Sequence, residues 1–250
     1  MFTYIFISSA SFIAGFIDSV AGGGGLITLP ALLAAGLPVH VALGTNKFQS
    51  MFGTTCALIN FSRKKKVLWK VAGIGIPFAL VGAAIGTKLV LIIPASIAAK
   101  IIVAFIPPLA LLVGFSRVMI KGKRDKKMGR FHLFFITPLA CLLIGTYDGF
   151  LGPGTGTLLI LAMVFLSHIG LIHATATAKA FNLASNVGAF VMFLISGCVF
   201  IPYGVTMAVF NILGNVVGSH FAISRGDVFI RKILFVSLAL LFVYLSWKYF

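Results

Sequence analysis

The sequence predicts an all-α polytopic membrane protein, built from two inverted-topology repeats whose helices are broken or re-entrant at glycine-rich motifs. Of its 250 residues, 60% are hydrophobic and 10% are charged, and the mean hydropathy is +1.13. A soluble domain carries about 25% charged residues on average. Apolar stretches recur along the whole chain, and residues 1–11 carry no lysine or arginine, so a single cleavable signal peptide does not explain this composition.

Ten apolar runs, separated by glycine, proline or charged residues, are the candidate helices. They cover residues 2–20, 24–36, 41–61, 71–93, 97–116, 131–150, 154–170, 174–197, 201–223 and 229–248. The runs 24–36 and 154–170 are shorter than the ~20 residues that span a bilayer. We therefore expect these two to be half-helices or re-entrant segments, and the sequence leaves open whether they cross.

Three motifs recur in the same order in the two halves of the chain. Residues 15–24 resemble 145–154, residues 45–47 resemble 177–179, and residues 82–87 resemble 214–219, at offsets of 130, 132 and 132. Such internal repeats are typical of secondary transporter folds. We therefore expect a first transmembrane repeat at 1–116, a basic cytoplasmic linker at 117–130 and a second transmembrane repeat at 131–250.

The basic residues indicate how the two halves are oriented. Fifteen of the 20 lysines and arginines fall in residues 63–70, 117–130 and 225–232, as in cytoplasmic loops of membrane proteins. The basic loop follows the third run in the first half and the fourth run in the second half, as inverted repeats require. Counting the membrane crossings between them places all three basic stretches on one side of the membrane and both termini on the other side. We expect these loops to contact anionic lipid headgroups of the bilayer, and not nucleic acid.

Two of the four acidic residues lie at matching positions inside apolar runs. Asp18 and Asp148 each precede a glycine-rich break by four residues, and an ionised group there is costly unless it is paired or hydrated. Each carboxylate could cap the half-helix that follows, hold a lysine, or take up a coupling proton. The breaks are expected to line a cavity and to point helix N-termini at an anion. Their residues are Gly22, Gly23, Gly24, Gly25, Gly152, Gly154, Thr155 and Gly156.

Matched polar stripes predict the other walls of that cavity. Lys47, Ser50 and Thr54 repeat the spacing of Lys179, Asn182 and Asn186, so each trio lies on one helical face. A lysine at membrane depth is a functional candidate by default. Either the two lysines attract a small oxyanion, or each pairs with the aspartate of its own half for structure alone. The predicted anion-binding residues are Thr45, Asn46, Lys47, Ser50, Lys179, Asn182 and Asn186.

Motifs of enzymes and of bound cofactors are missing from the sequence. It has no HExxH, no Ser–His–Asp pattern and no P-loop motif, and Cys56, Cys141 and Cys198 are isolated in apolar sequence. We therefore expect no catalytic residues, no cofactor and no metal site. Without an ATP-binding motif, an ion gradient or the membrane potential has to drive any uphill transport.

Residues 15–30, 42–47, 147–156 and 178–186 resemble the TauE/SafE family, also called the sulfite exporter or toluene-sulfonate uptake permease family. The resemblance covers essentially the whole chain. It implies a secondary transporter of the bacterial inner membrane for sulfite, sulfonates or organosulfur carboxylates. Pro153 and Thr155 replace the glycines of the first break, so the two breaks need not be equivalent. The resemblance leaves the anion, the direction, the coupling ion and a homodimer open, and a passive anion channel is the alternative.

Overall fold

The computed structural model describes residues 2–98, 100–101, 104, 129–166 and 169–249, with side chains described to 230 and at 232–233 in the last segment. All secondary structure in these residues is helical, which confirms the predicted all-α fold. The elements are α1 (Phe2–Ala21), α2 (Gly25–Ala34), α3 (Val39–Arg63), α4 (Trp69–Ile92), the π-helical turn η1 (His132–Ile136), α6 (Thr137–Phe150), α7 (Thr155–Phe165), α8 (Leu171–Ile195) and α9 (Ile201–Tyr249).

Five helical stretches within the described residues are long and apolar enough to cross a membrane. They are Phe2–Ala21, Trp69–Ile92, His132–Phe150, Leu171–Ile195 and Ile201–Ile230. Helix α3 is as long as α8, with 25 residues each, but its buried polar side chains lower its hydropathy. The predicted run 97–116 and the predicted linker 117–130 lie almost entirely outside the described residues.

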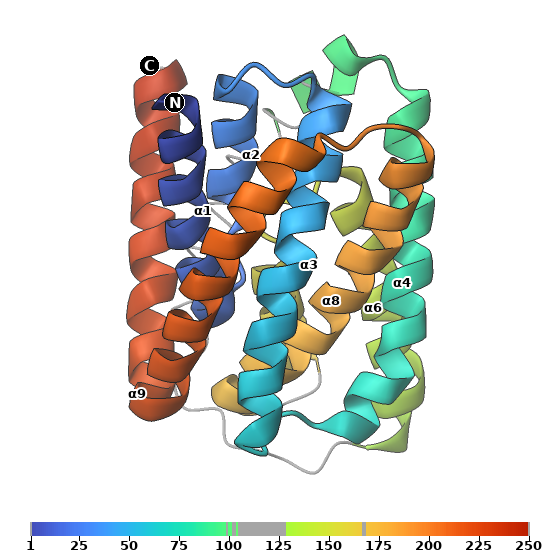
Figure 1. Cartoon of the computed structure of the whole chain (residues 1–250). Coiled ribbons are helices and arrows are strands. Elements are labelled where there is room, and N and C mark those ends of the chain that lie inside the picture. Colours follow the sequence, from blue (N-terminus) through green and yellow to red (C-terminus); the bar gives the residue numbers. More distant parts are fainter. Residues whose placement is uncertain (1, 99, 102–103, 105–128, 167–168, 250) are drawn as a thin grey trace.

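The helices form one bundle, and the α3–α4 loop and the turn within α9, which hold two of the basic stretches, lie at a single end (Figure 1). Helix α1 begins and α9 ends at the opposite end, and α2 returns toward the end at which α1 begins. Helix α9 turns back at Gly226, whose φ of 62° and ψ of −154° are not helical. A positive φ is a conformation that glycine adopts at low cost, so this residue separates the two runs predicted at 201–223 and 229–248.

Small residues let the two long helix pairs of the bundle pack closely. Helix α1 packs on α9, and the matching helix α6 packs on α4. A Cβ atom added to Gly15 would lie 2.5 Å from the Asn211 carbonyl oxygen, and one added to Gly145 would lie 2.6 Å from that of Ala79. These contacts occupy matching positions in the two halves, and small residues at helix crossings are typical of membrane proteins. The inverted repeat itself stays a prediction.

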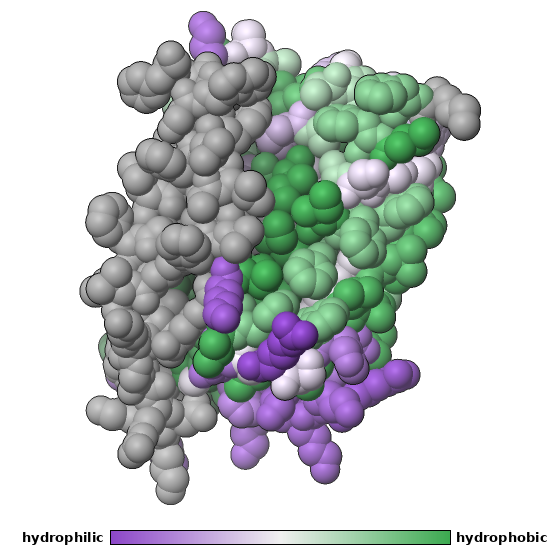
Figure 2. All heavy atoms as spheres, turned by 90° about the vertical axis from the view of Figure 1, so that its left-hand side faces the viewer, coloured by the Kyte–Doolittle hydropathy of each residue, from purple (hydrophilic) through white to green (hydrophobic). Residues whose placement is uncertain are grey.

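The outer surface of the bundle is apolar along its length. Figure 2 shows one face, where a hydrophobic band covers the middle and hydrophilic residues gather at the end that holds the α3–α4 loop. Exposed apolar side chains follow helical spacing on α4 and α9, at Val81, Ile85, Leu89, Val205, Val209 and Leu213. Lipid tails are as apolar as these side chains, so such a surface suits a bilayer and not water.

Candidate functional site

The two glycine breaks touch each other through their backbones. The Thr157 N–H donates to the Gly22 carbonyl over 3.2 Å, and the Thr157 hydroxyl donates to the Ala21 carbonyl over 2.7 Å. A Cβ atom at Gly156 would lie 2.5 Å from the Gly22 Cα atom, and Gly22 has a φ of 78°. Both positions therefore require glycine. Gly156 lacks space for a side chain, and Gly22 lacks space and also has a positive φ.

A small cavity lies beside this crossing, between the breaks and the polar stripes. It is lined by Asp18, Gly22, Gly25, Asn46, Lys47, Ser50, Asp148, Gly152, Thr155, Gly156, Asn182 and Asn186. The part that admits a water-sized molecule measures about 20 Å³, which is room for about one water, so any larger ligand requires the lining side chains to move. Gly25 and Gly156 stand in the first turns of α2 and α7, where backbone N–H groups have no partner four residues earlier in the helix.

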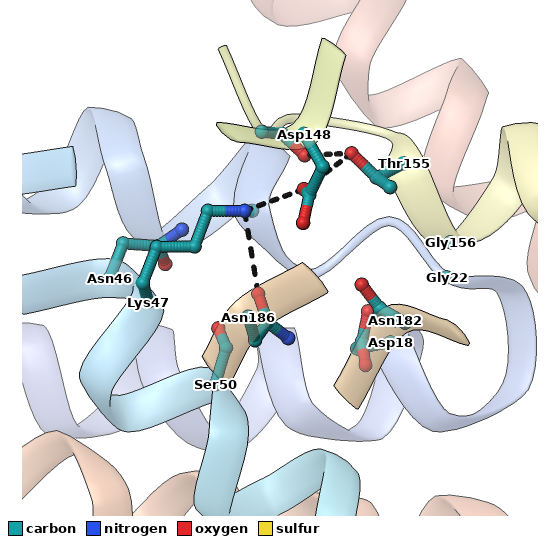
Figure 3. A pocket seen from close by; sticks show the side chains of 12 residues that line it. Asp18, Gly22, Asn46, Lys47, Ser50, Asp148, Thr155, Gly156, Asn182 and Asn186 are labelled. Carbon is teal, nitrogen blue, oxygen red and sulfur yellow. Dashed lines mark hydrogen bonds and ion pairs between the residues drawn. The ribbon is translucent and has the colours of Figure 1, made fainter. Parts of the chain in front are cut away.

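Lys47 reaches across the cavity to the second half of the chain (Figure 3). Its Nζ lies 2.5 Å from Asp148 Oδ1 and donates to Asn186 Oδ1 over 3.4 Å. The Thr155 hydroxyl also donates to Asp148 Oδ1, over 2.6 Å. The side chains of Lys47 and Asp148 are 3% and 2% exposed, so this ion pair is shielded from solvent.

Lys179 makes the matching contact with the first half. Its Nζ lies 3.0 Å from Asp18 Oδ2 and also donates to the Asp18 backbone carbonyl. The Lys179 side chain is 1% exposed, whereas that of Asp18 is 14% exposed and lines the cavity. Each lysine therefore pairs with the aspartate of the other half. The interpretation that each pairs within its own half is wrong.

The carboxylates hold lysines and do not cap the helices that follow them. Within the described part of the chain, no side chain makes a capping hydrogen bond at Gly24 before α2 or at Gly154 before α7. Two lysines and two aspartates balance one another in formal charge around the cavity. The field inside the cavity therefore depends on where the ammonium groups, the carboxylates and the helix N-termini point, and not on a net charge.

Five predicted site residues are not among those that line the cavity as the described residues define it, namely Gly23, Gly24, Thr45, Gly154 and Lys179. Thr45 serves another purpose, since its hydroxyl accepts a hydrogen bond of 2.9 Å from the Phe200 N–H. The Thr177 hydroxyl accepts one of 3.1 Å from the Leu68 N–H. Phe200 and Leu68 directly precede α9 and α4, so each threonine fixes a helix start in the other half.

A buried polar network beside the cavity was missed by the sequence analysis. The Asn46 side-chain oxygen accepts hydrogen bonds from Thr28 over 2.5 Å and from Gln49 over 3.0 Å. Gln49 also donates to Ser50 over 2.9 Å and accepts from Ser11 over 3.1 Å. A glutamine three residues after Asn46 in an apolar run was the available signal. Cys141 and Phe181 occupy the positions that match Ser11 and Gln49, so the network belongs to one half only.

Membrane-length helices, an apolar outer face and a buried charged cavity at two helix breaks define a multi-pass membrane transporter. A family model described as "Sulfite exporter TauE/SafE" matches residues 7–245. The chain therefore belongs to the TauE/SafE family. No solved structure matches the chain significantly.

Relatives of known sequence carry transporter names and not enzyme names. A "Probable membrane transporter protein ORF9" from Sinorhizobium sp. is 41% identical over 239 residues, which cover 94% of this chain and 89% of that protein. A "Probable membrane transporter protein" from Haemophilus influenzae is 38% identical, covering 90% and 87%. The "Probable membrane transporter protein YfcA" of Escherichia coli K12 is 37% identical, covering 90% and 82%.

Proposed function

We propose that this protein is a secondary transporter that moves a small sulfur-containing anion across the bacterial inner membrane, coupled to an ion gradient. The anion class is sulfite, a sulfonate or an organosulfur carboxylate. One observation carries the proposal: Lys47, a lysine whose side chain is almost completely buried, lines a cavity beside the two helix breaks. The family description, which names sulfite export, supports the choice of anion.

The other donors of the cavity fit the oxygen atoms of such an anion. The Asn182 and Asn186 amides and the Ser50 hydroxyl can each donate a hydrogen bond. The first turns of α2 and α7 add the positive ends of two helix dipoles, although N–H groups such as those of Leu26 and Thr157 already donate to backbone carbonyls. Lys179 lies behind Asp18 and contributes its charge to the same field. Planar or tetrahedral oxyanions accept several such hydrogen bonds at once.

Crosswise contacts support a binding site between two inverted repeats. Each of these contacts joins a residue of one half to a residue of the other half. They are the ion pairs Lys47–Asp148 and Lys179–Asp18 and the hydrogen bonds Thr45–Phe200 and Thr177–Leu68. Transporters with inverted repeats bind substrate at the repeat interface and expose it by moving one half against the other. In this protein such a movement would loosen one set of crosswise contacts while the matching set stays formed.

Flux of radiolabelled sulfite and sulfoacetate into proteoliposomes tests the proposal, with a pH dye inside and a set membrane potential. We expect saturable flux with coupled proton movement, and we expect Lys47→Ala to abolish it. Lys88→Ala is the matched control, because Lys88 is an exposed lysine of α4 that does not line the cavity. Flux that follows the potential without saturating would indicate a passive anion channel instead. Unchanged flux in Lys47→Ala would remove the assigned binding site.

A further inference from the structure

The two lysine–aspartate pairs match in sequence but differ in their contacts. Lys179 Nζ is held by two oxygens of one residue, the backbone carbonyl and the carboxylate of Asp18, and it does not line the cavity as described. Lys47 Nζ contacts two side-chain oxygens, on Asp148 and Asn186, and lines the cavity directly. Side chains can turn while a helix backbone stays in place, so Lys47 can leave its partners more readily than Lys179 can.

Asp148 has one carboxylate oxygen without a partner. Oδ1 accepts from both Lys47 and Thr155, whereas Oδ2 is buried and has no hydrogen-bond partner among the described residues. Asp148 is 1% exposed and lines the cavity. A buried acceptor without a donor is costly, and an ionised carboxylate can only accept. A proton on Oδ2 removes the charge and creates a hydroxyl that can donate to an oxyanion in the cavity.

We propose that Asp148 takes up the coupling proton on Oδ2 when the anion binds. Lys47 Nζ then exchanges its ion pair with Asp148 for one with the anion, and the Lys179–Asp18 pair stays closed. This inference rests on the proposed function of anion transport. The four charged groups of the site sum to zero, so an anion that binds alone leaves a net negative charge, and one proton on Asp148 lowers that charge by one. Net charge at membrane depth is costly, which makes the joint uptake more favourable than binding of the anion alone.

The surroundings of Asp148 favour this carboxylate over Asp18. Asp18 is the more exposed of the two, and the residue that matches Thr155 in its half is Gly25, which has no hydroxyl. Lys47 from α3 faces Asp148 directly, and the pair of Asp18 from α1 and Lys179 from α8 lies by the same cavity. The helices packed on α6 add few other titratable groups. Helix α7 has none, and α4 has two exposed lysines, Lys70 and Lys88. The others are His132 of η1, His173 of α8, and Cys141 and Tyr147 of α6 itself.

The first test compares wild type with Asp148→Asn in proteoliposomes that hold a pH dye. The asparagine imitates the protonated carboxyl, because it is neutral and can donate a hydrogen bond. We expect Asp148→Asn to retain exchange of labelled for unlabelled sulfoacetate, and to lose accumulation driven by a pH gradient. A variant that still accumulates sulfoacetate with the wild-type ratio of protons to anions would overturn the assignment.

A matched double variant separates the two pairs. In Asp18→Asn/Lys179→Gln the other pair is neutralised, and we expect the ratio of protons to anions to stay that of wild type even where the rate falls. In Asp148→Asn/Lys47→Gln we expect both binding and coupling to be lost. Loss of coupling in the first double variant with coupling kept in the second would place the proton on Asp18 and overturn the inference.

A measurement on wild type alone covers the case that variants do not fold. Calorimetric titration of the detergent-solubilised protein with sulfoacetate, in buffers of different ionisation enthalpy, counts the protons bound with the anion. Both acid groups of sulfoacetate are ionised at neutral pH, so the protein must supply the site for the proton. We expect uptake of about one proton per anion. Binding without proton uptake overturns this inference and leaves anion transport standing, whereas no binding or flux of sulfoacetate or sulfite overturns both.

Discussion

The Lys47 ammonium lies 2.5 Å from the Asp148 carboxylate, although the two residues belong to different halves of the chain. Both side chains are almost completely buried, so neither charge can turn to water if the other is removed. The pair therefore joins the halves at the cavity wall and makes their stabilities depend on each other. Removing one partner leaves an uncompensated charge at membrane depth.

A double-mutant cycle on this pair should show strong coupling. We expect Lys47→Met or Asp148→Leu alone to lower the free energy of unfolding by about 3–5 kcal/mol. The double variant should lose less than either single variant, because replacing a buried ion pair by apolar residues is often nearly neutral. Unfolding of the purified protein in detergent measures each value, with exposed Lys88→Met as a control that changes little. Additive losses would show that the pair does not act as a unit.

The crossing of the two breaks should not tolerate a methyl group. Gly156→Ala would place its Cβ against the Gly22 backbone, and Gly22→Ala adds the strain of a positive φ. We expect each to lower stability by about 1–3 kcal/mol and to reduce the yield of folded protein. Gly73→Ala is the matched control, because no described atom beyond its own helix lies within 4 Å of the added carbon. Equal yields of all three variants would contradict the close backbone contact.

Thr45 and Thr177 should each protect a helix start in the opposite half. Thr45→Val removes the acceptor for the Phe200 N–H, and Thr177→Val removes that for the Leu68 N–H. Both hydrogen bonds are part-buried, so losing either costs about 0.5–1.5 kcal/mol. Hydrogen exchange followed by mass spectrometry should show faster exchange at residues 197–203 in Thr45→Val only, and at 65–71 in Thr177→Val only. Thr55→Val is the control, since its hydroxyl donates to the Met51 carbonyl of its own helix.

Cysteine labelling checks which side of the membrane holds each end of the bundle. Cys198 lies in the loop between α8 and α9, at the end opposite the basic α3–α4 loop. With Cys56 and Cys141 replaced by alanine, a membrane-impermeant maleimide should label Cys198 from the periplasm. Lys64→Cys in a Cys198→Ala background should react only after the membrane is permeabilised. Labelling of Lys64→Cys in intact cells would reverse the orientation.

The same reaction has an expected pH dependence. Burial raises the pKa of the Cys198 thiol, so the reactive thiolate is a minor species at neutral pH. We expect the labelling rate to rise as pH increases toward the raised pKa. A rate that is already at its maximum at neutral pH would show that the thiol is more exposed than the fold indicates.

Helix positions were predictable because their signals are local. The run predicted at 41–61 is Val39–Arg63, and the run at 24–36 is Gly25–Ala34. Glycine or proline stands at three of these four ends, where the sequence displays the signal directly. Helix α3 ends instead at a run of lysines, with Lys65 at a φ of 55°. The polar stripe of Lys47 and Ser50 was predictable for the same reason, because helical spacing depends on sequence separation alone.

The partners of those side chains were not predictable from the sequence. Asp18 and Asp148 are equivalent in the repeat, so no spacing rule decides which lysine meets which carboxylate. That choice depends on how the helices fold back around the crossing at Gly22. The buried position of Gln49 was missed because a single glutamine gives no periodic pattern. Thr45 was assigned to the anion because its loop partner lies more than half the chain away.

The backbone hydrogen bond between Thr157 and Gly22 joins the two halves, so one half cannot be replaced without regard to the other. A chimeric chain that joins residues 1–116 of this protein to the second half of a relative must reproduce this contact, because no side chain is present at Gly22 or Gly156 to adjust the fit. Inserting one residue into either break would displace the backbone of the facing break. That displacement would separate both lysines from their carboxylates. Exchange of parts between relatives is therefore expected to succeed in the outer helices and to fail at the two breaks.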